Sequence, residues 1–267
     1  MKKIILALML AACSLLSNTL TQIKEKGVIR IGIDGSSPPF SVAKAGEYSG
    51  FEILLIEGLV KEIFGDKGSK IEYVVTVGDD RIKAVQDNRV DLDIALISVT
   101  KEREKLVDFS DPYFSVNIGV LTRSDDNIRK VSDLNGKTIL AQPGTTVFDY
   151  FTKQGYNVVP CASANECFND LKSGKGDGYG DDNLLVFAYA VVDRKVEVNI
   201  KNLGSTDFLA IAVQKGNTEL LDAVNSSLVK MYKAKFFHKA FDEDIKPYYG
   251  GKIDKKHFTL DEVYSLF

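Results

Sequence analysis

The sequence predicts an α/β protein made of two similar lobes that face each other across a ligand cleft. Apolar runs of strand length alternate with amphipathic helical segments along most of the 267 residues, a pattern typical of mostly parallel sheets covered by helices. The alternation occurs twice, over residues 28–97 and again over 138–192. In both units the strands end in small polar loops, and such sheets bind ligands outside the carboxyl ends of their strands.

Composition narrows the class of protein. The hydrophobic content of 45% and charged content of 27% are ordinary for a soluble globular protein. The net charge of −3 gives no sign of a nucleic-acid partner. The two histidines, His238 and His257, stand apart, and no cluster has the spacing of metal ligands. We therefore expect no metal and no cofactor, and we expect a monomer.

Residues 1–21 are expected to lie outside the fold. Residues 2–3 are lysines, residues 4–10 are apolar, and two alanines precede Cys13, as in an export signal too short to span a bilayer. The run ending at Cys13 resembles a bacterial lipobox, in which the cysteine is acylated and becomes the mature N-terminus. A plain secretory signal is the alternative. Residues 14–21 would then be a tether, and the protein an exported lipoprotein, periplasmic or at the cell surface.

The first unit is predicted from residue 28 onward. Its first loop, 34–40, contains two prolines that hold it open, with Phe40 at its tip. The expected elements are a strand at 28–33, a helix at 51–64, a strand at 71–75, a helix capped by Asp79 with Ile82 and Val85 on its apolar face, and a buried strand at 91–97 that includes Ile94 to Ile97.

The second unit follows an extended apolar stretch at 109–120. Its expected elements are a short helix at 132–137, strands at 138–141, 157–160 and 177–182, helices around Phe148, around Leu171 and at 183–192, one more strand at 207–213, and a long amphipathic helix around Val224. We predict one lobe from residues 22–117 with 206–267 and the other from 118–205, joined near 116–119 and 203–207.

Two cysteines remain in the predicted second lobe. Cys161 ends a predicted strand and Cys167 opens the next helix, so an exported protein could join them in a disulfide. Two buried thiols are the alternative, because spacing alone does not give geometry.

An anion site is predicted where the strand at 91–97 ends. Ser98 supplies a hydroxyl after Ile97, the following turn supplies free N–H groups, and Arg103 can bind a carboxylate bidentately. The alternative is an ordinary corner with a solvated arginine.

The second lobe offers two further groups at strand ends. Gly144, Thr145 and Thr146 open a helix after a turn, where hydroxyls and N–H groups can face an anion. Asp182 supplies a carboxylate, although it could simply cap the helix that follows it. Taken together, Arg103 and Asp182 match the two poles of a zwitterion, with the arginine on a carboxylate and the aspartate on an ammonium group.

Several segments resemble the bacterial extracellular solute-binding proteins of family 3, which serve polar amino-acid ABC importers. They are IRIGIDGSSPPF, LISVTKEREKLVDFSDPYF, ILAQPGTTVFDY and GDGYGDDNLL, and the likeness runs from about residue 28 to 248. The resemblance implies a type II periplasmic-binding-protein-like fold without enzymatic activity. Carried over by position, the ligand-binding set is Arg103, Ser98, Asp182, Thr145, Thr146, Gly144, Arg81, Phe40 and Ile97. Arg81 falls where relatives with acidic ligands place an arginine, and a solvated helix arginine is the alternative.

Two departures bear on the ligand. Ser37 stands where the family often has a stacking aromatic residue, and Val147 replaces a polar one, which argues against a long cationic side chain. FFHKAFDEDIKPYYG resembles cysteine-binding lipoprotein members, so a small polar amino acid, cysteine first, is expected. Hinge closure would capture it for a permease and its ATPase subunit.

Two other functions stay open. A dehydratase for prephenate-like substrates would use Asp181 beside Asp182, although neighbouring strand residues point to opposite sides. An exported adhesin or antigen is the other alternative.

Overall fold

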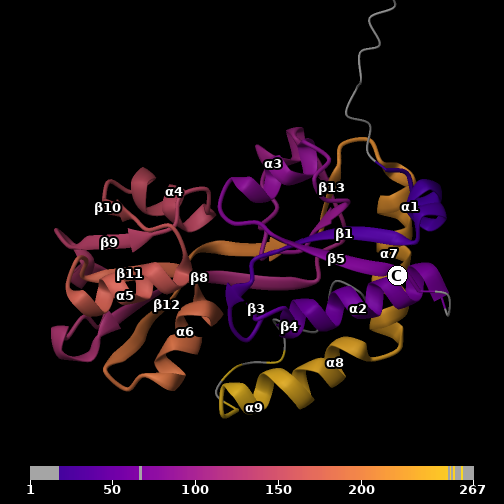
Figure 1. Ribbon diagram of the computed structural model, residues 1–267. Coiled ribbons are helices and arrows are strands. Elements are labelled where there is room, and N and C mark those ends of the chain that lie inside the picture. The colour runs from indigo at the N-terminus through magenta and orange to yellow at the C-terminus, as the bar shows by residue number, and fades with distance from the viewer. Residues whose placement is uncertain (1–17, 66–67, 252, 254, 256–259, 261–267) are drawn as a thin grey trace, which may run out of the picture.

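The computed structural model describes residues 18–65, 68–251, 253, 255 and 260, and its ribbon divides into two lobes (Figure 1). Each lobe is built around one five-stranded sheet flanked by helices, so the predicted two-lobe α/β class is confirmed. We call the part built on the first sheet the first lobe. That sheet has the order β5 (Lys70–Val75), β1 (Val28–Ile33), β6 (Leu92–Asp93), β13 (Ala212–Gln214) and β7 (Val107–Phe109).

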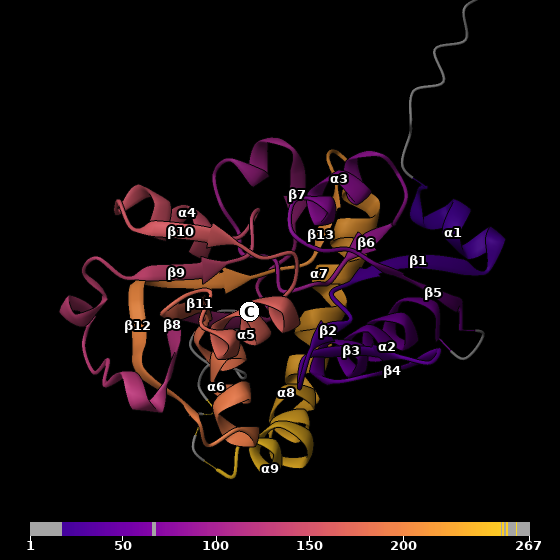
Figure 2. The ribbon, with the colours of Figure 1, turned by 60° about the vertical axis from the view of Figure 1, so that its left-hand side comes forward.

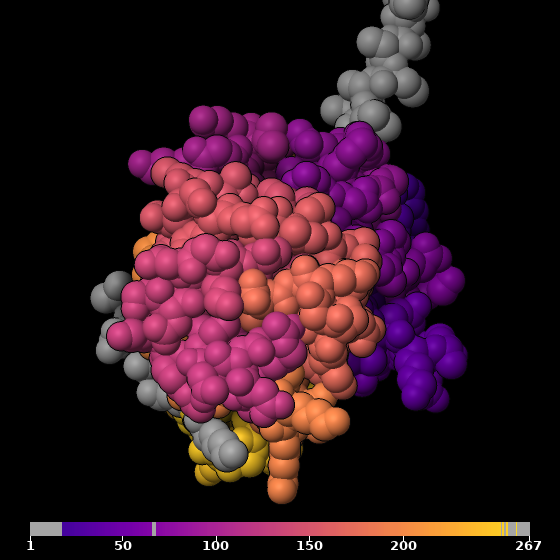
Figure 3. Space-filling model, turned by 90° about the vertical axis from the view of Figure 1, so that its left-hand side faces the viewer, coloured from indigo at the N-terminus to yellow at the C-terminus, as the bar shows by residue number. Residues whose placement is uncertain are grey.

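The second sheet belongs to the second lobe, whose magenta-to-orange surface faces the viewer in Figure 3. Its strand β11 is parallel to β9 and antiparallel to β8. The order is β10 (Asn157–Pro160), β9 (Thr138–Ala141), β11 (Gly178–Asp182), β8 (Phe114–Arg123) and β12 (Val196–Leu209).

Strands β8 and β12 also join the lobes. They pair antiparallel from Phe114 with Leu209 outward, with a shift in register between Leu203 and Asp207. At its first-lobe end Leu209 bridges to Ser98. The predicted crossovers, 116–119 and 203–207, lie within these strands, while the exact lobe boundaries remain a prediction.

Helices cover both sheets, as the two ribbon views show (Figures 1 and 2). In the first lobe α2 packs against α7 over the largest apolar core. From the second lobe, Leu184, Leu185 and Ala188 of α6 join that core, so the lobes touch. The helices are α1 (Leu20–Lys26), α2 (Phe51–Phe64), α3 (Asp80–Gln86), α4 (Thr146–Lys153), α5 (Ala164–Ser173), α6 (Asn183–Val192), α7 (Thr218–Lys233), α8 (Phe236–Ala240) and α9 (Lys246–Tyr248), with short 3-10 segments η2 (Arg103–Lys105), η3 (Ser124–Asp126) and η4 (Val131–Leu134) and a π-helical turn, η5 (Phe241–Ile245).

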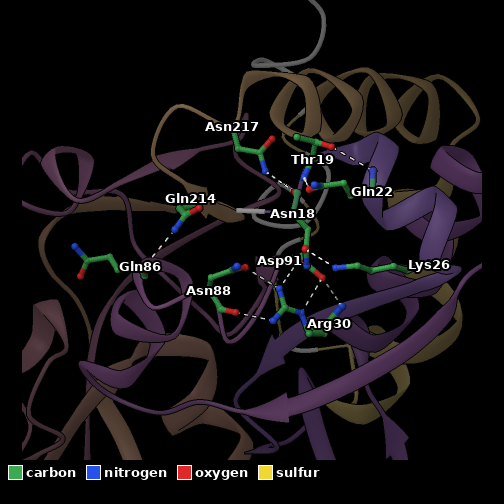
Figure 4. Close-up of polar contacts among 10 residues, drawn as sticks. All are labelled: Asn18, Thr19, Gln22, Lys26, Arg30, Gln86, Asn88, Asp91, Gln214 and Asn217. Carbon is green, nitrogen blue, oxygen red and sulfur yellow. Dashed lines mark hydrogen bonds and ion pairs between the residues drawn. The ribbon is translucent and has the colours of Figure 1, made fainter. Parts of the chain in front are cut away.

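The chain just before β1 is folded onto the first lobe (Figure 4). Asn18 donates to Asp91 over 2.9 Å, and its carbonyl accepts from Asn217 over 3.0 Å. Asp91 in turn holds Arg30 through two guanidinium contacts. The predicted tether is therefore too long, because residues 18–21 belong to the domain. Residues 1–17, including Cys13, lie outside the described part.

Three other expectations need correction. The buried strand predicted for 91–97 ends at Asp93, because Leu96 adopts a left-handed φ of 56° that turns the chain. Strand β12 begins at Val196, far before the predicted residue 207, in a stretch whose polar residues hid it. Asp79 precedes α3, yet its side chain makes no capping bond. A small sheet of β2 (Ser36–Ser37), β3 (Ser41–Lys44) and β4 (Glu47–Ser49) was also not predicted.

Candidate functional site

A polar cavity with about 410 Å³ of empty space lies between the lobes. Both lobes contribute to its wall, and the residues come from strand ends, helix starts and loops. The first lobe supplies Asp34, Ser37, Arg81, Leu96, Ser98 and Arg103, and the second supplies Gln142, Thr145, Thr146, Val147, Ala164, Asp181, Asp182 and Leu185.

Arg103 reaches the cavity from the short helical turn η2. Its Nη1 donates to the carbonyl of Ser98 over 2.7 Å and its Nη2 to the carbonyl of Gly144 over 2.8 Å. Burial, followed by the nearby charge of Arg81, lowers the pKa of Arg103 to about 10, so the guanidinium stays charged at neutral pH. Within the described part of the chain the guanidinium makes only these two hydrogen bonds, so it retains N–H groups that can bind a carboxylate bidentately.

The guanidinium of Arg81 makes more hydrogen bonds to the protein than that of Arg103. Its Nε donates to Gly78 over 2.9 Å, and its Nη1 donates to the carbonyls of Ala95 and Leu96 over 3.0 Å each. Its Nη2 donates to Gly144 over 3.2 Å. The alternative of a solvated helix arginine is therefore wrong: Arg81 is buried, lines the cavity and braces a loop of each lobe.

The second lobe places two carboxyl groups at the end of β11. Asp181 accepts from the hydroxyl of Tyr179 and from the backbone N–H of Asp182. Asp182 starts α6 without a side-chain capping bond, so the capping alternative is wrong. Burial, followed by the charge of Asp181, raises the pKa of Asp182 well above its ordinary range, and burial raises that of Asp181 to about 6.

Both aspartates line the cavity, contrary to the expectation that only one could face it. The expectation assumed a continuing strand, in which neighbours alternate. Here the two aspartates are the last two residues of β11, paired with Gly119 and Ile118 of β8, and α6 begins at Asn183, so both lie at the end of the strand that faces the cavity.

The loop before α4 supplies hydroxyl groups and one bridging carbonyl. Thr145 caps α4 by accepting from the N–H of Phe148 over 3.1 Å, and its hydroxyl donates to Gln142 over 2.7 Å. Thr145 and Thr146 line the cavity, whereas Gly144 does not and instead offers its carbonyl to both arginines.

Two predicted site residues lie elsewhere. Phe40 is 1% exposed and packs against Phe51 and Phe114 in the first-lobe core. Ile97 is fully buried in a separate apolar cluster with Val107. Neither lines the cavity, because adjacency to a strand end does not fix the face that a side chain takes.

Asp34 was not predicted as a site residue, although it directly follows the last residue of β1, Ile33. Its Oδ1 accepts from the N–H and hydroxyl of Ser36, both over 2.9 Å, and from the hydroxyl of Ser37 over 2.7 Å. Applying the strand-end rule to β1 would have found it. The two family departures, Ser37 and Val147, both line the cavity.

Cys161 and Cys167 form a disulfide, with their Cα atoms 5.2 Å apart. The bond spans the first turn of α5, where Ala164 reaches the cavity. The alternative of two free thiols is therefore wrong.

None of the helices formed by the described residues has the length and hydrophobicity of a membrane-spanning segment.

A polar cavity between two α/β lobes, with guanidinium groups on one wall and carboxyl groups on the other, is the architecture of a protein that captures a small charged solute. The chain belongs to the bacterial extracellular solute-binding proteins, family 3, whose family model matches residues 29–243. The resemblance seen in the sequence is thereby confirmed.

Individual relatives agree with this family. The chain is 38% identical to the solute receptor for L-cysteine of Neisseria gonorrhoeae, with a TM-score of 0.84 over 88% of this chain and 97% of that one. It is 35% identical to the cysteine-binding protein from Campylobacter jejuni, with a TM-score of 0.85 over 90% and 98%. It is 30% identical to the ABC transporter glutamine-binding protein GlnH of Bacillus subtilis, over 80% of each chain.

Proposed function

We propose that this chain is the substrate-binding component of an ABC importer and captures a free amino acid with a small polar side chain, cysteine first. One observation carries the proposal: Arg103 and Asp182 reach the same cavity from opposite lobes. A guanidinium and a carboxylate that face one space match the α-carboxylate and α-ammonium groups of a single amino acid.

The rest of the wall supports a small ligand. Ser98 and Thr146 bring hydroxyls to the cavity, whereas the hydroxyl of Thr145 already donates to Gln142. No aromatic side chain is among the described residues that line the cavity. A long cationic side chain would therefore lack a flat ring to stack on. The two cysteine-binding structures that the chain resembles support the same choice.

Capture is proposed to occur by closure of the lobes about β8 and β12. Arg81 and Arg103 both donate to the carbonyl of Gly144 across the cleft, which supplies contacts available only when the lobes are close. The ligand favours closure because it binds the closed form more tightly than the open one. The closed complex would then deliver the amino acid to the permease, with the lipid on Cys13 holding the exported protein, as a monomer, at a membrane.

The test is a thermal-shift screen of the purified protein against the twenty amino acids. A ligand that binds only the folded state raises the melting temperature by mass action. We expect the largest shift with L-cysteine, with L-glutamine as the comparison suggested by the glutamine-binding relative. No shift with any amino acid would contradict the proposal.

A dehydratase is the second candidate, because Asp181 and Asp182 both line the cavity and burial raises both pKa values. A carboxyl group that keeps its proton in the empty cavity can act as a general acid, whereas an ammonium group bound beside Asp182 would favour its charged form. We expect the purified protein to leave prephenate unchanged in a spectrophotometric assay. Turnover that Asp181→Asn abolishes would support the enzyme instead. Binding of amino acids without turnover would support transport rather than a role as an adhesin.

A further inference from the structure

Glu52 is a buried acid to which the proposed transport function assigns no role. It lies in the first turn of α2, is fully buried, and sits among the apolar residues of the first-lobe core. Its Oε1 accepts from the backbone N–H of Leu96 over 2.9 Å and from the hydroxyl of Tyr113. Its Oε2 has no hydrogen-bond partner in the described part of the chain. Burying a carboxyl group costs free energy unless hydrogen bonds compensate for the lost water. The hydrogen bond from the Leu96 N–H is one of the two that Glu52 accepts.

Leu96 has a backbone that a leucine rarely adopts. Its φ is 56°, in the left-handed region that disfavours side chains with a Cβ. This turn ends the strand β6 early and sends the chain toward Ser98. Leu96 also lines the cavity, so this left-handed residue forms part of the candidate ligand site.

The turn at Leu96 also sets the position of the first-lobe arginines. The carbonyls of Ala95 and Leu96 accept from Arg81 over 3.0 Å each. Further along, the carbonyl of Ser98 accepts from Arg103 over 2.7 Å. A chain of contacts therefore runs from Glu52 through one backbone turn to both guanidinium groups.

We propose that Glu52 is a positioning residue for the ligand cavity: by accepting from the Leu96 N–H, it holds the left-handed turn that orients Arg81 and Arg103. The consequence for affinity rests on the proposed function, whereas the hold on Leu96 does not. Burial raises the pKa of Glu52 to about 8, so near neutral pH the acceptor belongs to a largely protonated carboxyl. A glutamine therefore reproduces its useful oxygen.

Two substitutions separate the acceptor from the volume of the side chain. Glu52→Gln keeps an oxygen for the Leu96 N–H, and Glu52→Met keeps the size but loses the acceptor. Glu57→Met is the matched control, because Glu57 lies on the same helix but is exposed. If Glu52→Met does not fold, adding Tyr113→Phe removes the orphaned hydroxyl and provides a second variant.

The first readout needs no ligand. Amide hydrogen exchange at Leu96 should be at least tenfold faster in Glu52→Met than in the wild type, and close to the wild-type rate in Glu52→Gln and Glu57→Met. Unchanged protection of the Leu96 amide in Glu52→Met would overturn the proposal, whatever the protein binds.

The second readout is the Kd for L-cysteine by calorimetry. Glu52→Met should weaken binding at least tenfold and Glu52→Gln by less than threefold. Glycine adopts the left-handed turn without help, so in a Leu96→Gly background the Glu52→Met change should cost less than threefold. An equal loss in both backgrounds would refute the positioning role. If wild-type protein binds no amino acid, the proposed function fails while the exchange result still decides the role of Glu52.

Discussion

The two walls of the cavity differ in charge. The first lobe contributes both guanidinium groups, and the second contributes Asp181 and Asp182. The first lobe also carries Asp34, but three hydrogen bonds from Ser36 and Ser37 already engage one of its oxygens. We propose that this distribution of charge favours a ligand with opposite poles, bound with its carboxylate toward the first wall.

The walls also differ in how the chain holds them. Behind the first wall lie two buried carboxyl groups. Glu52 accepts hydrogen bonds from the Leu96 N–H and the Tyr113 hydroxyl, and Asp93 accepts one from the Thr76 hydroxyl. In the second wall a disulfide joins Cys161, just before α5, to Cys167 within α5. Hydrogen-bonded acids respond to pH, and a disulfide responds to reduction. The comparison predicts that each wall can be perturbed separately.

The largest effect is expected from removing the positive pole. Arg103→Ala should weaken amino-acid binding by about 100-fold or more, because hydrogen bonds to charged groups are worth about 1.5–3 kcal/mol each and the ligand carboxylate would lose at least two. Calorimetry gives the Kd. Arg129→Ala is the matched control, since Arg129 is an exposed arginine paired with Glu197 in the second lobe. Full affinity in Arg103→Ala would place the carboxylate elsewhere.

Removing the Cys161–Cys167 disulfide from the second wall should have the next largest effect, on the free energy of unfolding. The cysteines are 6 residues apart, and closing a loop of that size stabilises a protein by about 2 kcal/mol in the chain-entropy model. The double variant Cys161→Ala/Cys167→Ala should lose about that much free energy of unfolding in a urea titration. Reductant should lower the stability of the wild type and leave the double variant unchanged. Equal stability of both proteins would mean that the bond is dispensable.

A smaller effect is expected where the two walls meet. A Cβ on Gly144 would come within 2.5 Å of the backbone nitrogen and the Oδ1 of Asp79, and the φ of 78° already favours glycine. Gly144→Ala should therefore oppose closure and raise the Kd by about tenfold, equivalent to about 1.4 kcal/mol. Small-angle scattering with saturating ligand should then show a larger radius of gyration than for the wild type. An identical radius and Kd would remove Gly144 from the closing contact.

The first wall should also respond to pH. Burial raises the pKa of Asp93 from its ordinary 3.8 to about 8, and that of Glu52 from 4.5 to about 8. The folded state keeps protons that the unfolded state loses, so this stabilisation is full below about pH 4 and is lost as the pH rises through 8. Each group contributes at most about 1.4 kcal/mol per pH unit. Between pH 6 and 8 the unfolding free energy should fall less steeply in Asp93→Asn than in the wild type. Parallel slopes would contradict the assignment.

The sequence predicted regular elements well where the apolar period was uninterrupted. The strand at 138–141 and the helix at 183–192 match β9 and α6 residue for residue. Polar and charged residues interrupt the pattern in β12, so residues 196–206 were missed. The left-handed turn at Leu96 left no sign either, because its support comes from Glu52, 44 residues away in sequence.

The candidate site was predictable in part for similar reasons. Arg103, Asp182 and Thr145 follow strand ends, and the fold gathers strand ends at the cleft. Phe40 also follows a strand, yet it packs inward against Phe114. Ala164 carries no chemical signal at all, since only the three-dimensional path of α5 brings it to the cavity. Sequence position indicated the edge of the sheet, but the direction of each side chain depends on packing.

The most direct test of the two-pole account is a calorimetric comparison of three ligands: the free amino acid that gives the largest thermal shift, its N-acetyl derivative and its carboxamide. With Arg103 on the carboxylate and Asp182 on the ammonium group, both derivatives should bind at least 100-fold more weakly than the parent, because each leaves one buried charged group without its partner (about 3 kcal/mol or more). Affinity for either derivative equal to that for the parent would show that one of the two walls does not grip the ligand.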